Sequence, residues 1–150
     1  MSDPHIRLLN AKAWCEKKHV RLTPQRQQVL QLILQHPTAI TAYELLGQLQ
    51  ASTQPNAKPP TVYRALDFLL TQGLIHKVQS TNRYLACCLP DHPHHSSQLF
   101  ICDDCGQITE IHDNEIANAL TQKAQLQGFT MTNPMIEIHG ICQNCTKILK

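Results

Sequence analysis

Two short cysteine motifs are the part of this sequence best suited to do chemistry. The first is Cys102-Asp103-Asp104-Cys105 and the second is Cys142-Gln143-Asn144-Cys145. Two residues between the cysteines allow one tight turn to present both sulfurs to the same ion, and two such turns supply the four thiolates of a structural zinc site. We therefore predict one structural zinc ion, with the ligands Cys102, Cys105, Cys142 and Cys145.

Two other uses of these cysteines have to be weighed. A single Cys-x-x-Cys motif is often a redox pair, and two pairs could be disulfides in a secreted protein. The first residues of the sequence do not resemble a signal peptide, because no apolar segment follows them. We therefore expect the seven cysteines to be reduced thiols in a cytoplasm. No apolar run approaches the roughly 20 residues of a membrane span.

The elements before the first cysteine motif predict a winged helix-turn-helix domain. The order is three helices, a fourth helix with a polar face and a β-hairpin, and we place these elements at residues 5–18, 24–36, 41–50, 60–71, 74–78 and 83–87. Thr23-Pro24 and Thr41 are typical helix starts. In the first helix, we expect Ile6, Leu9 and Ala13 to lie on one stripe, with Trp14 nearby.

The rest of the chain predicts a smaller domain that contains both cysteine motifs. Its elements are expected at residues 98–101, 107–111, 114–127 and 129–139, with a helix at 114–127 and strands elsewhere. The fold class is therefore α+β. We predict three regions: a winged-helix domain at 1–89, a hinge at 90–97, and an α/β zinc-binding domain at 98–150. The 42% apolar content excludes wholesale disorder.

Charge is distributed unevenly between these regions. Residues 1–89 carry ten Lys and Arg against four Asp and Glu, a net +6, whereas residues 90–150 carry three against seven, a net −4. A basic half joined to an acidic half rich in Cys and His indicates a nucleic-acid reader joined to a metal module. The alternative is that the charge is divided between the two halves by chance.

The 60–71 helix is the predicted DNA-recognition helix. Val62, Leu66 and Leu69 share one face, and the polar side chains fall away from it. In a helix-turn-helix fold such a polar face reads base edges or phosphates. The candidate DNA contacts are Tyr43, Thr61, Tyr63 and Arg64. The alternative is that these side chains form an ordinary solvated helix face.

A second metal site is predicted from residues scattered along the chain. Its candidate ligands are His76, Cys87, His95 and Glu110. A thiolate, two imidazoles and a carboxylate suit four-coordinate zinc. On opposite strands of the hairpin, His76 and Cys87 are expected to come close to facing each other. Because the four residues come from both halves and from the hinge, a bound ion would act as a switch. The spacing leaves His92, His94 and Cys88 open as rival ligands.

The sequence resembles the ferric uptake regulator (Fur) superfamily, and especially its zinc-sensing branch, the zinc uptake regulators. The resemblance extends from about residue 20 to residue 145. It rests on the segments 21–26 (RLTPQR), 59–69 (PPTVYRALDFL), 73–78 (GLIHKV), 100–106 (FICDDCG) and 139–145 (HGICQNC).

This resemblance implies a bacterial, cytoplasmic homodimer that represses zinc-uptake genes by binding AT-rich palindromic operator DNA when zinc is bound. It also implies that residues 1–89 are the DNA-binding domain, that residues 98–150 are the α/β dimerisation domain, and that each monomer binds two zinc ions. The structural site of the family falls on the four cysteines of the two motifs, and the regulatory site of the zinc branch falls on His76, Cys87, His95 and Glu110. The family's DNA contacts fall on Tyr43 and Arg64. No membrane and no small organic substrate are expected.

Related sensors of iron, manganese or peroxide are the first alternative. The iron branch has a nearly continuous His/Asp run before its first cysteine motif, whereas residues 91–97 here are interrupted by Pro and Ser. A third metal site, found in some relatives, could use His94 or His112. The second alternative is an enzyme, either a zinc hydrolase or a thiol oxidoreductase. It is disfavoured because both ligand sets close at four residues and because neither cysteine motif is predicted to open a helix after a strand.

Overall fold

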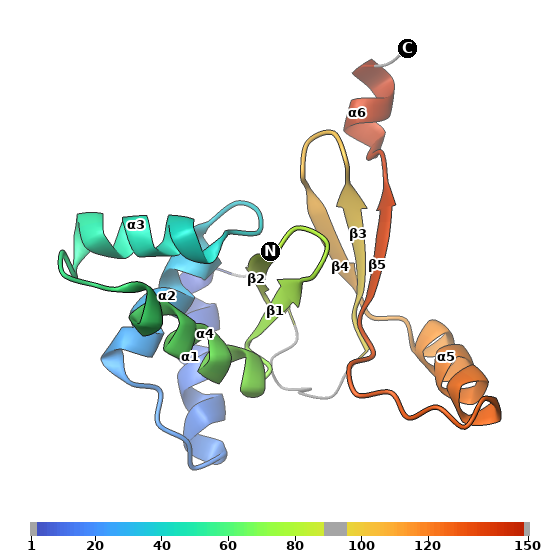
Figure 1. Ribbon diagram of the computed structural model, residues 1–150, viewed down its shortest axis with the longest axis horizontal. Helices are drawn as coiled ribbons and strands as arrows, with labels where there is room; N and C mark the ends of the chain where they lie inside the picture. The colour runs from blue at the N-terminus through green and yellow to red at the C-terminus, as the bar shows by residue number, and fades with distance from the viewer. Residues whose placement is uncertain (1–2, 89–95, 149–150) are drawn as a thin grey trace. The chain divides into compact units, whose positions relative to one another are not determined.

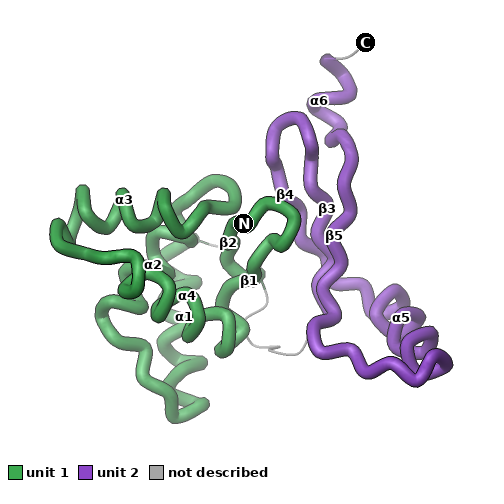
Figure 2. The backbone as a smooth tube through the Cα atoms, viewed as in Figure 1, with its two compact units in different colours: residues 1–93 green, residues 94–150 purple. Residues whose placement is uncertain are grey.

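The computed structural model describes residues 3–88 and 96–148, and the chain divides into two compact units, Met1–Pro93 and His94–Lys150 (Figure 2). Residues 90–95 of the predicted hinge, which include His92, His94 and His95, lie outside the described residues. Among the residues described, no helix is both long enough and apolar enough to cross a membrane.

The first unit begins with four helices (Figure 1), and their ends follow local sequence signals. They are α1 (Pro4–Lys17), α2 (Pro24–Gln35), α3 (Ala42–Ser52) and α4 (Pro59–Thr71). Pro occupies the first turn of α2 and α4, where its missing N–H costs nothing. In α3, the Thr41 hydroxyl accepts from the Glu44 amide and the Glu44 carboxylate accepts from the Thr41 amide, which makes a capping box.

A β-hairpin completes the first unit. Strands β1 (Ile75–Val78) and β2 (Arg83–Ala86) are antiparallel, with His76 opposite Leu85. The turn between them contains Asn82 with a positive φ of 53°, a conformation that Asn tolerates. On the other side of β2, Ile40 and Tyr84 exchange two backbone hydrogen bonds. This order of elements is a winged helix-turn-helix fold.

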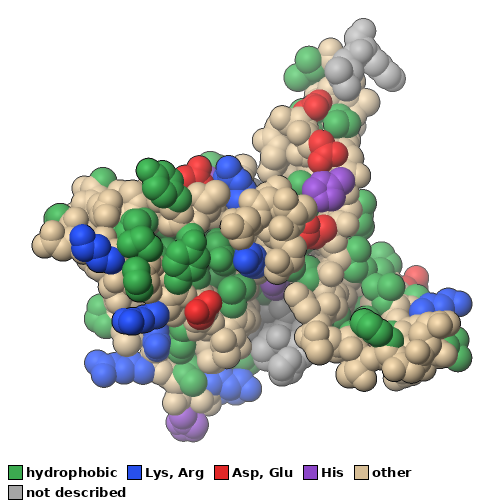
Figure 3. All heavy atoms as spheres, in the orientation of Figure 1, with side chains coloured by type: hydrophobic (Ala, Val, Ile, Leu, Met, Phe, Trp, Pro, Cys, Tyr) green, Lys and Arg blue, Asp and Glu red, His purple; other side chains and the backbone are tan. Residues whose placement is uncertain are grey.

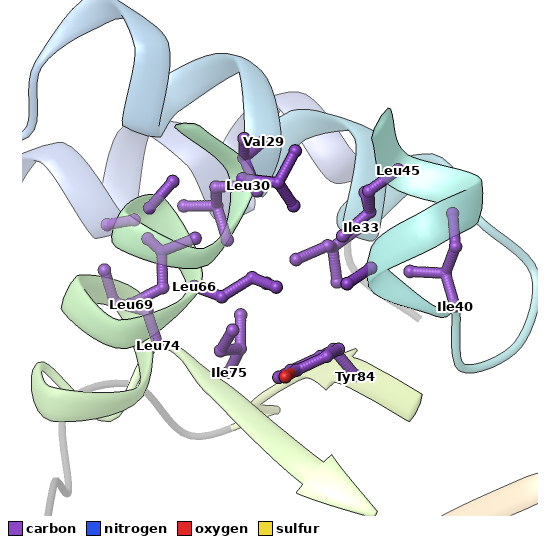
Figure 4. Packing of buried hydrophobic residues seen from close by; sticks show 14 of the residues in the cluster. Val29, Leu30, Ile33, Ile40, Leu45, Leu66, Leu69, Leu74, Ile75 and Tyr84 are labelled. Carbon is purple, nitrogen blue, oxygen red and sulfur yellow. The ribbon is translucent and has the colours of Figure 1, made fainter. Parts of the chain in front are cut away.

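The core of the first unit lies between α4, the hairpin and the other helices (Figure 4). Leu66 and Leu69 of α4 are completely buried, as are Leu45 of α3 and Ile75 of β1. The predicted apolar face of the recognition helix is therefore the face that packs inward. Its polar residues are left on the surface.

The stripe predicted on α1 is not the face that the helix buries, although Trp14 near that stripe is buried. Ile6, Leu9 and Ala13 are exposed. The residues that α1 buries instead are Leu8, Ala11, Trp14 and Cys15. Trp14 explains the difference, because its indole N–H donates to the carbonyl of Gln72 at the end of α4, with 3.3 Å between the nitrogen and the oxygen. Docking this largest side chain rotates the helix away from the predicted stripe.

The second unit is built on a three-stranded sheet with the order β4-β3-β5. Its elements are β3 (Gln98–Cys102), β4 (Ile108–Ile111), α5 (Asn114–Leu126), β5 (Ile136–Gly140) and α6 (Gln143–Ile148). Strand β3 is antiparallel to β4 and parallel to β5. Of the strands predicted over 129–139, only β5 is present, since residues 129–135 form no strand. Pro134 within that stretch cannot donate a backbone hydrogen bond.

Helix α5 is amphipathic but buries none of its residues. Its apolar residues Ile116 and Leu120 are 37% and 36% exposed, and in Figure 1 the helix lies beyond one end of the sheet. The sheet also leaves Phe100 and Ile138 at the surface. Figure 3 shows hydrophobic side chains on the surface of this unit. The second unit thus leaves apolar side chains of its helix and of its sheet at the surface.

Candidate metal centre and nucleic-acid interface

The first cysteine motif is a tight turn at the end of a buried strand. Cys102 is the last residue of β3, and its carbonyl accepts a hydrogen bond from the amide of Gly106. Gly106 has a positive φ of 72°, which glycine adopts without strain. The turn therefore places Cys102 in the interior, where it is 4% exposed, and Cys105 at the surface.

The second motif is brought beside the first by the parallel pairing of β5 with β3. In that pairing Gly140 lies opposite Cys102, and Cys142 follows two residues later. The prediction that neither motif opens a helix after a strand is wrong for this one, because Cys142 lies directly between β5 and α6. That placement alone would suit a redox pair, but the distances between the sulfur atoms of the two motifs favour a shared metal ion.

All four sulfurs of the two motifs lie within 4.8 Å of one another. The sulfurs of Cys105 and Cys142, which belong to different motifs, are 3.8 Å apart. This separation is far longer than a disulfide bond. Four sulfurs at about 2.3 Å from a central zinc ion would be about 3.8 Å apart at the corners of a tetrahedron. The four thiols therefore fit a tetrathiolate zinc shell.

Backbone amides lower the pKa of one of these thiols, that of Cys102. The N–H groups of Cys105 and Cys142 point at the sulfur of Cys102 and lower the pKa of this thiol to about 6, and the Cys142 nitrogen lies 3.3 Å from that sulfur. The neighbouring Cys142 thiol raises the pKa of Cys145. Crowded thiols that keep their protons can release them when a divalent cation binds.

The residues predicted for the second metal site are found in three places. His76 and Cys87 are in the first unit, Glu110 is in the second, and His95 is outside the described residues. His76 pairs with Leu85, two residues before Cys87, so the two predicted ligands come close to facing each other, as expected, with an offset of two residues. A shift of two keeps both side chains on the same face of the hairpin, and their ligand atoms lie within 4.8 Å. The assignment of the four residues as one site stays a prediction.

Glu110 of β4 has polar neighbours in its own unit. The Ser97 hydroxyl donates to one oxygen of the Glu110 carboxylate at 2.8 Å, and the His112 ring nitrogen Nε2 lies 3.4 Å from the same oxygen. Ser97 is 2% exposed. These contacts hold the carboxylate in one orientation. Sequence reasoning missed Ser97, since nothing in its spacing distinguishes it from an ordinary loop serine.

The candidate DNA contacts lie on the surface of the first unit. Tyr43, in the first turn of α3, is 85% exposed, and Tyr63 of α4 is 49% exposed. Arg64 is exposed, and Thr61 is half-buried. The surrounding surface suits a polyanion, since Figure 3 shows Lys and Arg side chains spread over this unit. These positions leave the four residues accessible to DNA.

Comparison with known proteins identifies the relatives of this chain. The model of the ferric uptake regulator family matches residues 17–139. The chain belongs to the ferric uptake regulator family. It is 47% identical to the zinc uptake regulation protein of Escherichia coli (strain K12) over 141 residues, which cover 94% of this chain and 82% of that protein.

Solved structures of family members have the same fold. A zinc uptake regulator complexed with zinc and DNA matches with a TM-score of 0.93 and 44% identity, over 99% of both chains. The crystal structure of holo XcZur matches with a TM-score of 0.88 and 35% identity, over 97% of this chain and 99% of that one. The resemblance inferred from the cysteine motifs and the recognition helix is therefore confirmed at the level of the family.

Proposed function

We propose that this family member is a bacterial, cytoplasmic, zinc-responsive transcriptional repressor that binds the operators of zinc-uptake genes as a homodimer when zinc is bound. The observation that carries this proposal is the close match, over nearly the whole chain, to a regulator solved with both zinc and DNA. The four-cysteine cluster supports it independently, because its geometry suits zinc.

The two metal sites have different roles in this proposal. Zinc held by Cys102, Cys105, Cys142 and Cys145 would be permanent and would stabilise the second unit. Structural zinc contributes about 10–16 kcal/mol in small zinc-binding peptides, so loss of one cysteine is expected to cost the unit its fold. Zinc at His76, Cys87, His95 and Glu110 would be removable and would set DNA affinity. In both sites the ion supplies only a shared positive centre for the ligands.

DNA recognition is assigned to α4 and the start of α3. The buried face of α4 holds the helix in the core, so the polar face carrying Tyr63 and Arg64 is presented to solvent in a fixed orientation. A guanidinium can pair with guanine or with a phosphate. Tyr43 is placed to contact the DNA backbone, as Tyr side chains do in many protein–DNA complexes.

The homodimer is assigned to the second unit. Its apolar residues Phe100, Ile116, Leu120 and Ile138 are exposed in the single chain. A second copy that covered them would remove apolar surface from water, at roughly 25 cal/mol per Å². Two copies would also present two recognition helices to the two halves of a palindromic operator.

No catalytic role is proposed for the zinc ions. A catalytic zinc keeps one position open for water or substrate, whereas four protein ligands fill the tetrahedral shell. Each of the two ligand sets assigned above has four protein ligands. The thiols of the two motifs are also assigned to zinc and not to disulfide exchange.

One experiment tests the function directly. DNA duplexes that bind the purified, zinc-loaded protein are first selected from a random library. The protein is then treated with a mild chelator, and its zinc content and its binding to the selected duplexes are measured. We expect one zinc ion per chain to resist the chelator and a second to be removed, with duplex binding lost on removal and restored by Zn(II). If Fe(II) or Mn(II) restores duplex binding more strongly than Zn(II), the protein is a sensor of that metal. If duplex binding is the same with and without each of the three metals, a metal-responsive repressor is excluded.

A further inference from the structure

A side-chain hydrogen bond connects the two cysteine motifs outside the zinc ligands themselves. Asp103 lies inside the first motif, and His139 lies in β5, three residues before Cys142. The His139 nitrogen Nδ1 is 2.8 Å from an Asp103 carboxylate oxygen. Because an ionised carboxylate can only accept, Nδ1 must carry the proton and donate it. We call this pair the His139–Asp103 latch.

The latch lies where backbone hydrogen bonds already connect the two motifs. The amide of Asp103 donates to the carbonyl of Gly140 at 2.8 Å, one step beyond the paired residues of β3 and β5. The amide of Cys142 donates to the sulfur of Cys102 at 3.3 Å. The side-chain bond lies beside these two backbone contacts, so it fixes the first motif against the strand that leads into the second.

We propose that the His139–Asp103 latch positions the two cysteine motifs for zinc and slows the release of the ion. This inference rests on the tetrathiolate zinc of the proposed function. Each motif supplies only two sulfurs, so the ion can leave when one motif moves away from the other. A hydrogen bond that spans the motifs must break during that movement. Partners outside the ligand shell commonly change metal affinity by about 10–100-fold.

The exposure of the pair predicts where its effect should be seen. The side chains of His139 and Asp103 are 39% and 54% exposed, and exposed ion pairs contribute little to global stability. The second carboxylate near the ring, Glu137, lies 3.9 Å from Nε2, beyond hydrogen-bond distance. The latch should therefore alter the rate of zinc loss from the folded protein far more than the melting temperature.

The test uses the full-length, zinc-loaded protein and a chromogenic chelator that reports zinc release over time. We expect His139→Ala and Asp103→Ala to release the tightly held zinc about tenfold faster than the unaltered protein, with nearly unchanged melting temperatures. The double variant should be no faster than either single variant, because both remove the same bond.

Conservative variants separate the hydrogen bond from the charge. Asp103→Asn keeps an oxygen that can accept from the ring, and His139→Asn keeps an N–H donor near the position of Nδ1. Both should release zinc nearly as slowly as the unaltered protein. If Asp103→Asn releases zinc as fast as Asp103→Ala, the charge is responsible and the latch is excluded.

Asp104→Ala is the matched control, since it removes the same charge from the same motif. The backbone N–H of Asp104, which faces Cys102, is kept in this variant. We expect its release rate to be unchanged. Equal acceleration by Asp104→Ala, or no acceleration by His139→Ala, would overturn the latch and leave the proposed repressor function intact. Failure of the unaltered zinc-loaded protein to bind DNA would overturn that function without affecting the release rates.

Discussion

Arg64 is the residue on which DNA recognition is expected to depend most directly. Its neighbours Leu66 and Ala65 are buried, so the helix cannot turn to offer a different face. Removing its guanidinium in Arg64→Ala should weaken binding to the selected duplex by about 1–3 kcal/mol, while zinc content per chain stays the same. Binding isotherms at a fixed salt concentration measure this loss.

A charge-matched control shows whether the effect is local. Lys17→Ala removes one positive charge from the exposed end of α1, on a different element from α4. We expect at most a small, salt-dependent change for this variant. Equal losses for the two variants would mean that Arg64 acts only through the net charge of the unit.

Cys87 is the residue that best separates the two proposed metal sites. It lies in the first unit, apart in sequence from both cysteine motifs, and it is buried. Cys87→Ser should leave one tightly held zinc ion per chain but abolish the dependence of DNA binding on added zinc. Metal analysis and duplex shifts on the same sample measure both. The adjacent exposed Cys88 is the matched control, and loss of the zinc response in Cys88→Ser instead would transfer the ligand role to it.

Individual site residues could be predicted from the sequence where residue type and spacing coincide. The two Cys-x-x-Cys motifs are of this kind, and the structure brings their four sulfurs together. Asp103 and His139 were not predicted, because their contact depends on the parallel pairing of β3 with β5. A carboxylate inside a cysteine motif and a histidine shortly before the next one were the available signals.

At the scale of single elements, the residue at which a helix starts could be predicted, but the face that the helix buries could not. Thr41 and Glu44 form a local capping box, which depends on residues only three positions apart. The buried face of α1 depends instead on a long-range contact between Trp14 and the end of α4. For the same reason, the strands predicted over 129–139 are reduced to β5, whose length is set by its partner β3.

The capping box of α3 makes a prediction about pH. The backbone hydrogen bond from Thr41, followed by its hydroxyl, holds the pKa of Glu44 below its ordinary value. A carboxylate with a lowered pKa in the folded state stabilises the protein above its unfolded pKa of about 4.3, and this contribution is lost as pH falls through the folded pKa. Glu44→Ala should therefore lower the free energy of unfolding by about 1 kcal/mol or less at pH 7.

Denaturant titrations at pH 7 and at about pH 3 measure this change. At the lower pH the destabilisation caused by Glu44→Ala should shrink, since a protonated carboxyl caps the helix poorly. Gln48→Ala, one turn further along the exposed side of α3, is the control and should have no such pH dependence. A Glu44→Ala penalty that is equal at both pH values would exclude the charged capping box as its cause.

At the scale of the whole molecule, charge and apolar surface are divided between the units. The basic half of the chain forms the winged helix, and the acidic half forms the unit with the four cysteines. The winged-helix order could be read from the sequence because its signals are local. The exposure of the apolar face of α5 could not be read from the sequence. An amphipathic pattern shows that a helix has an apolar side but not what covers that side.

The apolar side of α5 leads to the last prediction. Ile116 and Leu120 are one helical turn apart and both are more than a third exposed, so we expect a second copy of the chain to cover them. Leu120→Asp would place an unpaired charge in that interface, which is costly. Sedimentation should then show a monomer that keeps its tightly held zinc but binds the palindromic duplex weakly. Gln122→Asp adds the same charge to a different side of α5, and it should remain dimeric. Dimers of equal stability for both variants would show that the two copies meet elsewhere.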